Sequence, residues 1–209
     1  MTSPSRKLNV GCGGTPLDGW VSLDKHDYPH VDILYDLESG HQMQWRAKVT
    51  PYVPEGKWGY TVPDDTFDEI AMIHVVEHVQ NILPCMQELW RVAKPGCRLS
   101  ITCPYGSSDN ADEDPTHVRR IYSNSFVYFS QCWYGKNSYG YTGDWELETA
   151  IFSIYRGMFT DKPGPEQRDL RIRTLRNVVD EFAAGLVAIK PARKPGFEPK
   201  APRVRYRLV

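Results

Sequence analysis

The chain has 209 residues, 41% of them hydrophobic, and a net charge of −1, which is enough apolar material for the core of one domain. No apolar run approaches the roughly 20 residues of a membrane-spanning helix, and residues 1–7 are too polar for a signal peptide, so we expect no membrane association. The five cysteines form no Cys-x-x-Cys pair, as expected for reduced thiols in a cytoplasmic protein.

The stretch Leu8–Gly14 predicts a buried strand that runs into a glycine loop, with Gly11, Cys12 and Gly13 at the turn. Glycines allow a ligand to lie against backbone amides without a side chain in the way. A second predicted strand, Val21–Asp24, ends in a carboxylate that could accept hydrogen bonds from both hydroxyls of a ribose. This pattern predicts a site for a nucleoside-containing cofactor.

The spacing of this motif favours a cofactor without a phosphate chain. Asp24 follows Gly13 by 11 positions, whereas the dinucleotide fingerprint has its acidic residue about 20 residues further on. Pro16 stands where a third glycine is expected, and no Gly-x-x-x-x-Gly-Lys-Ser/Thr loop occurs in the chain. S-adenosylmethionine is the common cofactor with these properties.

Two further strands are expected after the loop. Residues 31–37 predict a third strand, and Asp36 near its end is well placed to meet the exocyclic amine of adenine. Residues 67–74 predict a fourth strand that ends at His74. Carboxyl ends of parallel strands share one edge of a sheet, so Gly11, Asp24, Asp36 and His74 are expected around one pocket.

Apolar residues at spacings of three and four predict a helix from about Val76 to Ala93, which ends at Lys94-Pro95-Gly96. A fifth strand is predicted over Arg98–Cys103. Alternating strands and helices predict an α/β fold with a parallel sheet covered on both faces.

Six segments, in order, resemble the small class I S-adenosylmethionine-dependent methyltransferases, specifically the compact bacterial and phage-type group. The segments are residues 8–13, 19–24, 36–37, 65–69, 74–78 and 91–96. The resemblance implies that Gly11, Cys12 and Gly13 hold the methionine moiety, that Asp24 holds the ribose, and that Asp36 and Leu37 flank the adenine. It also implies that residues around His74 close the pocket.

A competing motif, His74-Val-Val-Glu77-His78, matches the His-x-x-Glu-His pattern of zinc peptidases. The motif is expected at a strand end and helix start, where His74 and His78 would not share one helical face. No third ligand is marked downstream, although a zinc site needs one. We therefore expect no metal, and stoichiometric zinc in the purified protein would contradict this interpretation.

Two residues are candidates for catalysis. His117, in Asp114-Pro-Thr-His117, follows a polar loop and could remove a proton from an acceptor hydroxyl or amine. A histidine that braces the following segment is an equally good interpretation of the same residue. Tyr105, after the fifth strand and Pro104, is expected to line the mouth of the pocket.

The C-terminal quarter, residues 162–209, holds 12 Lys and Arg against 5 Asp and Glu. This surplus suits an anionic ligand, and it equally suits a solvated face beside the acidic remainder of the chain. Residues 144–151 predict another strand, and residues 186–189 and 203–209 predict a terminal hairpin at the antiparallel edge of the sheet.

The resulting prediction is a single Rossmann-like domain over residues 1–209, with a mostly parallel, doubly wound sheet and a C-terminal antiparallel edge hairpin. Segments 39–62 and 105–143 are expected to form an insert and a substrate lid. The predicted activity is methyl transfer from S-adenosylmethionine to a small metabolite, a saccharide or a nucleotide, with nucleic acid not favoured. The alternative is a protein that binds S-adenosylmethionine without methyl transfer and acts as a regulator or partner subunit.

Overall fold

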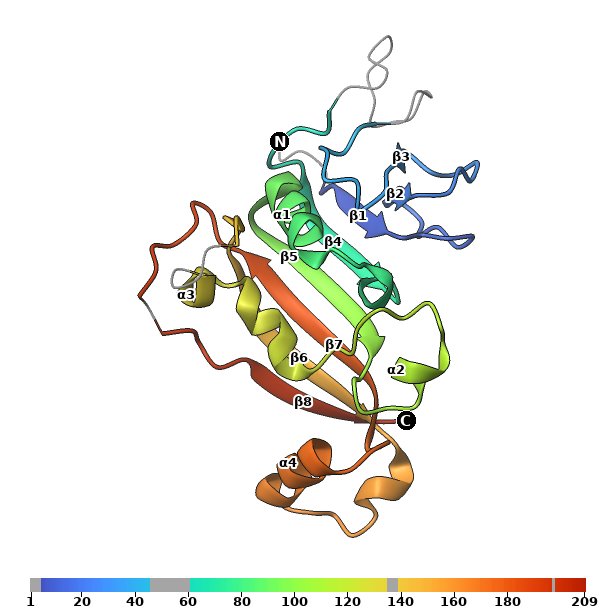
Figure 1. The fold of residues 1–209 in the computed structure, drawn as a ribbon, viewed down its shortest axis with the longest axis vertical. Helices are drawn as coiled ribbons and strands as arrows, with labels where there is room; N and C mark the ends of the chain where they lie inside the picture. Colours follow the sequence, from blue (N-terminus) through green and yellow to red (C-terminus); the bar gives the residue numbers. More distant parts are fainter. Residues whose placement is uncertain (1–4, 46–60, 135–138, 197) are drawn as a thin grey trace.

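The computed structural model describes residues 5–45, 61–134, 139–196 and 198–209 (Figure 1). Eight strands form one sheet in the order β3-β2-β1-β4-β5-β7-β6-β8. The strands are β1 (Lys7–Val10), β2 (Val21–Asp24), β3 (Ile33–Leu34), β4 (Phe67–Ile73), β5 (Ala93–Pro104), β6 (Trp145–Ile154), β7 (Val179–Ala188) and β8 (Arg203–Leu208). The α-helices are α1 (Ile82–Val92), α2 (Asn110–Glu113), α3 (Gln131–Tyr134) and α4 (Pro165–Thr174). The 3-10 helices are η1 (Val76–His78), η2 (Ser123–Phe129) and η3 (Arg156–Phe159).

The first five strands pair in parallel, so the carboxyl ends of β1 to β5 point to one edge of the sheet. β7 pairs antiparallel with both β5 and β6, which places the start of β7 beside the end of β5. The predicted α/β, Rossmann-like, mostly parallel sheet with antiparallel C-terminal strands is confirmed. The predicted strand over residues 144–151 is also confirmed, as β6.

The predicted terminal hairpin is wrong in its pairing. β7 and β8 are not neighbours: β8 pairs in parallel with β6, from Thr149–Arg203 to Ile154–Leu208. The segment between β7 and β8 crosses past β6, and β7 extends over ten residues rather than the four expected. Alternating burial along β7 shows why it is a central strand, since Phe182, Ala184 and Leu186 are all buried.

The predicted helix over residues 76–93 is divided in two. Residues 76–78 form the 3-10 helix η1, Val79 is extended, and α1 begins only at Ile82. Pro84 explains the break, because in a continuous helix its ring would clash with the carbonyl of residue 80. In the observed helix Pro84 lies in the first turn, where a missing N–H costs little.

The end of this helix also differs from the prediction. Lys94, Pro95 and Gly96 lie within β5 instead of a separate turn. The pairing of β4 with β5 shifts between Phe67–Ala93 and Glu69–Arg98, so residues 94–97 form a bulge opposite Asp68. Gly96 has a φ of +77° there, a conformation that favours glycine.

The hydrophobic core lies on one face of the sheet, where α1 packs against β5 and η2 packs against β6 and β7 (Figure 1). On the opposite face of β5, Arg98 and Ser100 are exposed, whereas Leu99 and Ile101 are buried. The expected cover on both faces is therefore wrong for this strand among the described residues. In a doubly wound sheet, helices connect successive parallel strands. Residues 11–20 and 25–32, which connect β1 to β2 and β2 to β3, form no helix.

No helix in the described ranges is long and apolar enough to cross a membrane. All five cysteines are buried free thiols. Burial raises the pKa of Cys85 and of Cys97 to about 12, so both thiols remain protonated and unreactive at neutral pH.

A buried ion pair attaches the segment after β7 to β6. Asp144 is fully buried, and its carboxylate accepts hydrogen bonds from Arg193 Nε at 2.8 Å and Nη2 at 2.9 Å. It also accepts from the backbone N–H groups of Arg193 and Gln131. Arg193 also pairs with Glu146. These bonds hold the start of the β7–β8 connection against the sheet.

We expect Arg193→Ala to lower the free energy of unfolding by about 3 kcal/mol, because it leaves Asp144 buried without a cation. Arg203→Ala is the matched control, since Arg203 is largely exposed and 3.7 Å from Glu148; its effect should stay below about 1 kcal/mol. Urea denaturation followed by circular dichroism measures both. Equal effects for the two variants would contradict the role given to Arg193.

Candidate functional site

A cavity of about 680 Å³ opens at the carboxyl ends of β1, β2 and β4 and beside the residues that follow β3. We call it the larger cavity. It is lined by Gly11, Gly13, Leu23, Asp24, Lys25, His26, Tyr28, Tyr35, Asp36, Leu37, Glu38, His74, Val75, His78, Val79, Gln80, Pro115, Thr116 and Val118. Six of the seven residues predicted for the cofactor are in this lining. Its volume is within the range of about 300–1,000 Å³ that is typical of ligand sites.

The glycine loop needs glycine at Gly11 for two reasons. Its φ is +65°, and a Cβ at this position would lie 2.3 Å from Cγ2 of Val75. Gly13 has a φ of +52°, and a Cβ there would meet no atom within 4 Å. The space beside Gly13 is thus open to a ligand, while the space beside Gly11 is filled by the segment after β4.

Asp24 stabilises this loop as well as facing the cavity. Its Oδ2 accepts a hydrogen bond from Gly13 N at 2.9 Å, and its Oδ1 accepts one from His26 N at 2.8 Å. The residue is buried. Each carboxylate oxygen has more than one acceptor site, so both oxygens can also accept hydrogen bonds from ligand hydroxyls.

Cys12 differs from its glycine neighbours. Its side chain is buried and is not part of the cavity lining, and its backbone N–H donates to Leu23 O at 3.1 Å. Burial, followed by the charge of Asp24, raises the pKa of its thiol. Cys12 therefore shapes the loop through its backbone.

Asp36 and Leu37 lie at the far end of the cavity from β4. Asp36 Oδ1 accepts a hydrogen bond from Glu38 N at 3.0 Å, which shapes the turn after β3. The order β3-β2-β1-β4 places Asp36, Asp24, Gly11 and His74 along the cavity in that sequence. The lining thus runs from one strand end to the next, as the sequence predicts.

His74 stands at the end of β4 in the left-handed conformation, with a φ of +52°. Its Nδ1 lies 3.3 Å from Glu77 Oε1, and its Nε2 lies 2.8 Å from Glu181 Oε1. The hydrogen bond with Glu77 raises the pKa of His74, and the negative charges of Glu77 and Glu181 act in the same direction. The imidazole is therefore held between two carboxylates and keeps its proton to higher pH than a free histidine.

A second cavity of about 320 Å³, the smaller cavity, adjoins the first. It is lined by His74, Glu77, His78, Pro104, Asn110, Asp114, His117, Asp180 and Glu181. His74 and His78 line both cavities. The predicted catalytic residue His117 lies in the smaller cavity, and its ring contacts that of His78 at a centroid distance of 4.8 Å.

The segment that carries His117 is attached directly to the residues after β4. Val118 N donates to Glu77 O at 2.9 Å. The guanidinium of Arg119 donates to Val79 O at 2.9 Å from Nε and at 2.6 Å from Nη2. These bonds place His117 beside His78, although the two residues are far apart in the sequence.

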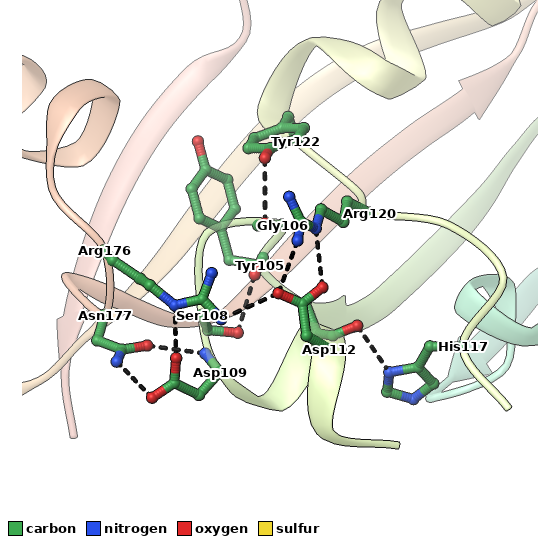
Figure 2. A network of polar contacts seen from close by, with 11 residues as sticks. Tyr105, Gly106, Ser108, Asp109, Asp112, His117, Arg120, Tyr122, Arg176 and Asn177 are labelled. Atoms are coloured by element: carbon green, nitrogen blue, oxygen red, sulfur yellow. Dashed lines mark hydrogen bonds and ion pairs between the residues drawn. The ribbon is translucent and has the colours of Figure 1, made fainter. Parts of the chain in front are cut away.

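A network of ion pairs fixes the other side of the same segment (Figure 2). Asp112 accepts two hydrogen bonds of 2.8 Å from Arg120 and one of 2.9 Å from Arg176. Asp109 accepts from Arg176 Nε at 2.6 Å and from Asn177 Nδ2 at 2.7 Å. The arginines lower the pKa of both aspartates, so the network stays ionised at neutral pH.

Tyr105 lies outside both cavities. It is buried and packs against Tyr122, Phe152 and Phe182, with centroid distances of 5.5, 5.7 and 6.0 Å. Burial raises the pKa of its hydroxyl. Tyr105 thus belongs to an aromatic cluster of the core instead of the expected pocket mouth.

Several lining residues were missed by the sequence reasoning. Glu181 and Asp180 begin β7 and reach the smaller cavity because β7 runs antiparallel beside β5. No short motif marks them. Thr116 could have been found, since it stands next to His117 and its Oγ1 lies 3.0 Å from His78 Nδ1.

Residues 8–101 match the family model described as a methyltransferase domain. The cyclase SpnF is similar in structure, with a TM-score of 0.51 and 16% identity over 90% of this chain and 75% of that chain. A methyltransferase dependent on S-adenosylmethionine from Archaeoglobus fulgidus gives a TM-score of 0.49 and 14% identity over 88% and 86% of the two chains. A similar enzyme from Aquifex aeolicus gives 0.45 and 15% over 88% and 82%. No curated protein sequence matches the chain.

The matched range contains the glycine loop, Asp24 and the end of β4. The match defines the class of this part of the chain: residues 8–101 form a methyltransferase domain. S-adenosylmethionine is accordingly its cofactor. The similarity to SpnF shows the fold alone. His117 and the residues of β7 lie beyond the matched range.

Gly11→Ala should weaken S-adenosylmethionine binding strongly, because the new methyl group would displace Val75 from the wall of the larger cavity. The left-handed backbone adds a cost of about 1–2 kcal/mol. Isothermal titration calorimetry measures the affinity. Gly14→Ala is the control, since Gly14 has an ordinary φ and free space around it, and its affinity should be unchanged. Unchanged affinity in Gly11→Ala would contradict the role of this wall.

Arg176→Gln should loosen the segment from Ser107 to Val118, because it removes the bonds to both Asp109 and Asp112. We expect faster amide hydrogen exchange in this segment, with little change in the exchange of the central strands. Arg173→Gln, which removes an exposed pair with Asp169, is the control and should leave the segment unchanged. Equal exchange in both variants would show that the network does not hold the segment.

Proposed function

We propose that S-adenosylmethionine binds in the larger cavity and that its methyl group is transferred to a hydroxyl or amine of a small acceptor in the smaller cavity. The observation that carries this proposal is the wall that the two cavities share. His74 and His78 line both, so a ligand in each cavity would meet its neighbour beside these two side chains.

The residues present are suited to the cofactor in a definite order. Asp36 and Leu37 would hold the adenine, Asp24 the ribose, and Gly11 and Gly13 the methionine moiety. The order of the strands supports this assignment, because adenine is then furthest from β4 and the methionine end is nearest to it. The reactive end would thus face the smaller cavity.

The cofactor supplies a methyl group that is already activated by its positively charged sulfur. The protein therefore needs mainly to hold donor and acceptor in line, which can account for much of the acceleration. Glu77, Val79 and their partners serve this purpose, since their backbone carbonyls hold the His117 segment against the end of β4.

The lining of the smaller cavity favours an uncharged or cationic acceptor. Glu77, Asp114, Asp180 and Glu181 all face it. Their hydrogen-bond partners include Thr116, Asn110 and Tyr155, which are neutral, and His74 is the partner that can carry positive charge. Phosphate groups would be repelled, so a small metabolite or saccharide fits better than a nucleotide.

His117 is the proposed proton acceptor for the acceptor group. Its Nδ1 lies 3.2 Å from the carbonyl oxygen of Ala111, and a carbonyl can only accept, so Nδ1 carries the proton. Nε2 of the neutral ring then has the lone pair that can receive a proton.

Asp24→Ala should weaken S-adenosylmethionine binding by about 100-fold, since it removes two hydrogen bonds to a charged acceptor. His117→Asn should keep that affinity and lower the turnover by about 100-fold or more. Calorimetry gives the affinity, and S-adenosylhomocysteine formation with a panel of small alcohols, sugars and amines gives the turnover.

Asp18→Ala and His41→Asn are the matched controls, because both residues are exposed and lie outside the two cavities. Unchanged cofactor affinity in Asp24→Ala would contradict the proposed cofactor site. Undiminished turnover in His117→Asn would contradict the assignment of the smaller cavity. Cofactor binding without turnover on any acceptor of the panel would favour the alternative of a binding protein.

A further inference from the structure

The smaller cavity contains a buried carboxylate that the proposed function does not explain. Glu77 is 2% exposed. Its Oε1 lies 3.3 Å from His74 Nδ1, while Oε2 is buried and has no hydrogen-bond partner among the described residues. A buried carboxylate oxygen without a partner is costly in a protein interior, so such an atom points to a ligand that would satisfy it.

Two imidazoles stand beside this carboxylate. One ligand atom from each of Glu77, His78 and His117 can be chosen so that all three lie within 4.8 Å of one another. Ligand atoms that are each about 2.1 Å from one ion lie at most about 4.2 Å apart. The three side chains therefore need to approach by less than about 1 Å to share an ion.

Both imidazoles are oriented as metal ligands are. His78 Nδ1 lies 3.0 Å from Thr116 Oγ1, whose own proton is donated to Asp114 Oδ1, and 3.3 Å from the carbonyl oxygen of Thr116. His117 Nδ1 lies 3.2 Å from the carbonyl oxygen of Ala111. Because carbonyls accept, both Nδ1 atoms carry protons and both Nε2 atoms keep their lone pairs. Metal-binding histidines usually donate their second N–H to a carbonyl or carboxylate in this way.

The carboxylate is oriented as well. His74 holds Oε1 of Glu77 and is itself held by Glu181 Oε1 at 2.8 Å. This chain of bonds leaves Oε2 as the oxygen available to a ligand. Asp114 adds negative charge at the rim, with its Oδ2 3.8 Å from His117 Nε2.

We propose that Glu77, His78 and His117 bind a divalent transition-metal cation in the smaller cavity. Two imidazoles and one carboxylate with open positions form the donor set of catalytic zinc and non-haem iron sites. Imidazole nitrogens select such ions over Mg²⁺ and Ca²⁺, which prefer all-oxygen sites. The site differs from the zinc motif considered in the sequence, because His117 replaces His74 as the second imidazole.

The bound cation would activate the methyl acceptor, an inference that rests on the proposed function. A hydroxyl bound to the ion has a lowered pKa and loses its proton to water at the cavity mouth. The acceptor oxygen then forms a bond to the methyl carbon, the carbon–sulfur bond breaks, and its electron pair stays on sulfur. With the ion bound, Nε2 of His117 is a metal ligand and no longer the proton acceptor described above. The ion then lowers the pKa of the acceptor in its place, which favours a hydroxyl over an amine as the acceptor.

The test measures metal binding to full-length protein that has been treated with a chelator and desalted. Zn²⁺, Co²⁺, Mn²⁺ and Mg²⁺ are each titrated against a competing indicator. We expect one equivalent of Zn²⁺ or Co²⁺ to bind and Mg²⁺ not to compete. Loss of a group that hydrogen-bonds to a metal ligand typically weakens metal binding by roughly 10–100-fold. We expect a larger loss of Zn²⁺ affinity when a ligand itself is replaced, as in Glu77→Gln, His78→Asn and His117→Asn. His41→Asn is the control and should bind as the wild type does.

Folding of each variant is checked by circular dichroism, because His78 also lines the larger cavity and its replacement can change the affinity for S-adenosylmethionine directly. The visible spectrum of bound Co²⁺ in the wild type gives a second measurement that needs no variant. The intensity of this spectrum should indicate a low coordination number. The spectrum should change when acetohydroxamate, a small oxygen ligand, binds to the open position. An unchanged spectrum would contradict the claim that the ion has an open coordination position. It would also contradict the proposed role of the ion in activating an acceptor hydroxyl.

Absence of stoichiometric Zn²⁺ or Co²⁺ binding in protein that binds S-adenosylmethionine would overturn the metal site and leave the proposed function intact. Binding that persists in all three variants would place the ion elsewhere and would also overturn it. Metal binding without S-adenosylmethionine binding would support the metal site and contradict the proposed cofactor site.

Discussion

A carboxylate buried as deeply as that of Glu77 has to be stabilised by its surroundings, and much of the nearby structure does this. The chain reverses at His74 in a left-handed conformation, which brings the imidazole back over the carboxylate three residues later. Glu181 from β7 holds the other side of that imidazole. The backbone of Glu77 in turn accepts the N–H of Val118 and so positions the loop that carries His117.

The two cavities are built by different parts of the chain. The larger cavity is formed mainly by residues within the matched methyltransferase domain, at the ends of strands that follow one another in sequence. The smaller cavity combines the turn after β4 with the loop after β5 and the start of β7, and most of its lining lies beyond residue 101. The larger cavity thus belongs mainly to the matched domain, while most of the smaller cavity is built by residues outside it.

This division explains how much could be predicted. Strands β1, β2, β4 and β6 could be predicted from local apolar patterns. The cavity-lining residues Gly11, Asp24, Asp36 and His74 could be predicted too, because each of them follows or ends an apolar run. The pairing of β8 with β6 could not be predicted, because nothing in residues 203–209 distinguishes a parallel partner from an antiparallel one. The contact of His78 with His117 depends on long-range bonds from Arg119, which has no motif. Tyr105 was misplaced because its aromatic neighbours Phe152 and Phe182 come from strands that are distant in the sequence, so no local pattern marks its burial.

The two outer strands of the described sheet differ in length and charge. β3 has two residues and offers few backbone groups for pairing with another molecule. β8 has six exposed residues, and Arg203, Arg205 and Arg207 alternate along it. A second copy that aligned with β8 would bring like charges together, which keeps this edge from extending into a fibre. High salt screens such repulsion, so self-association in concentrated solution should begin along β8 and grow with ionic strength.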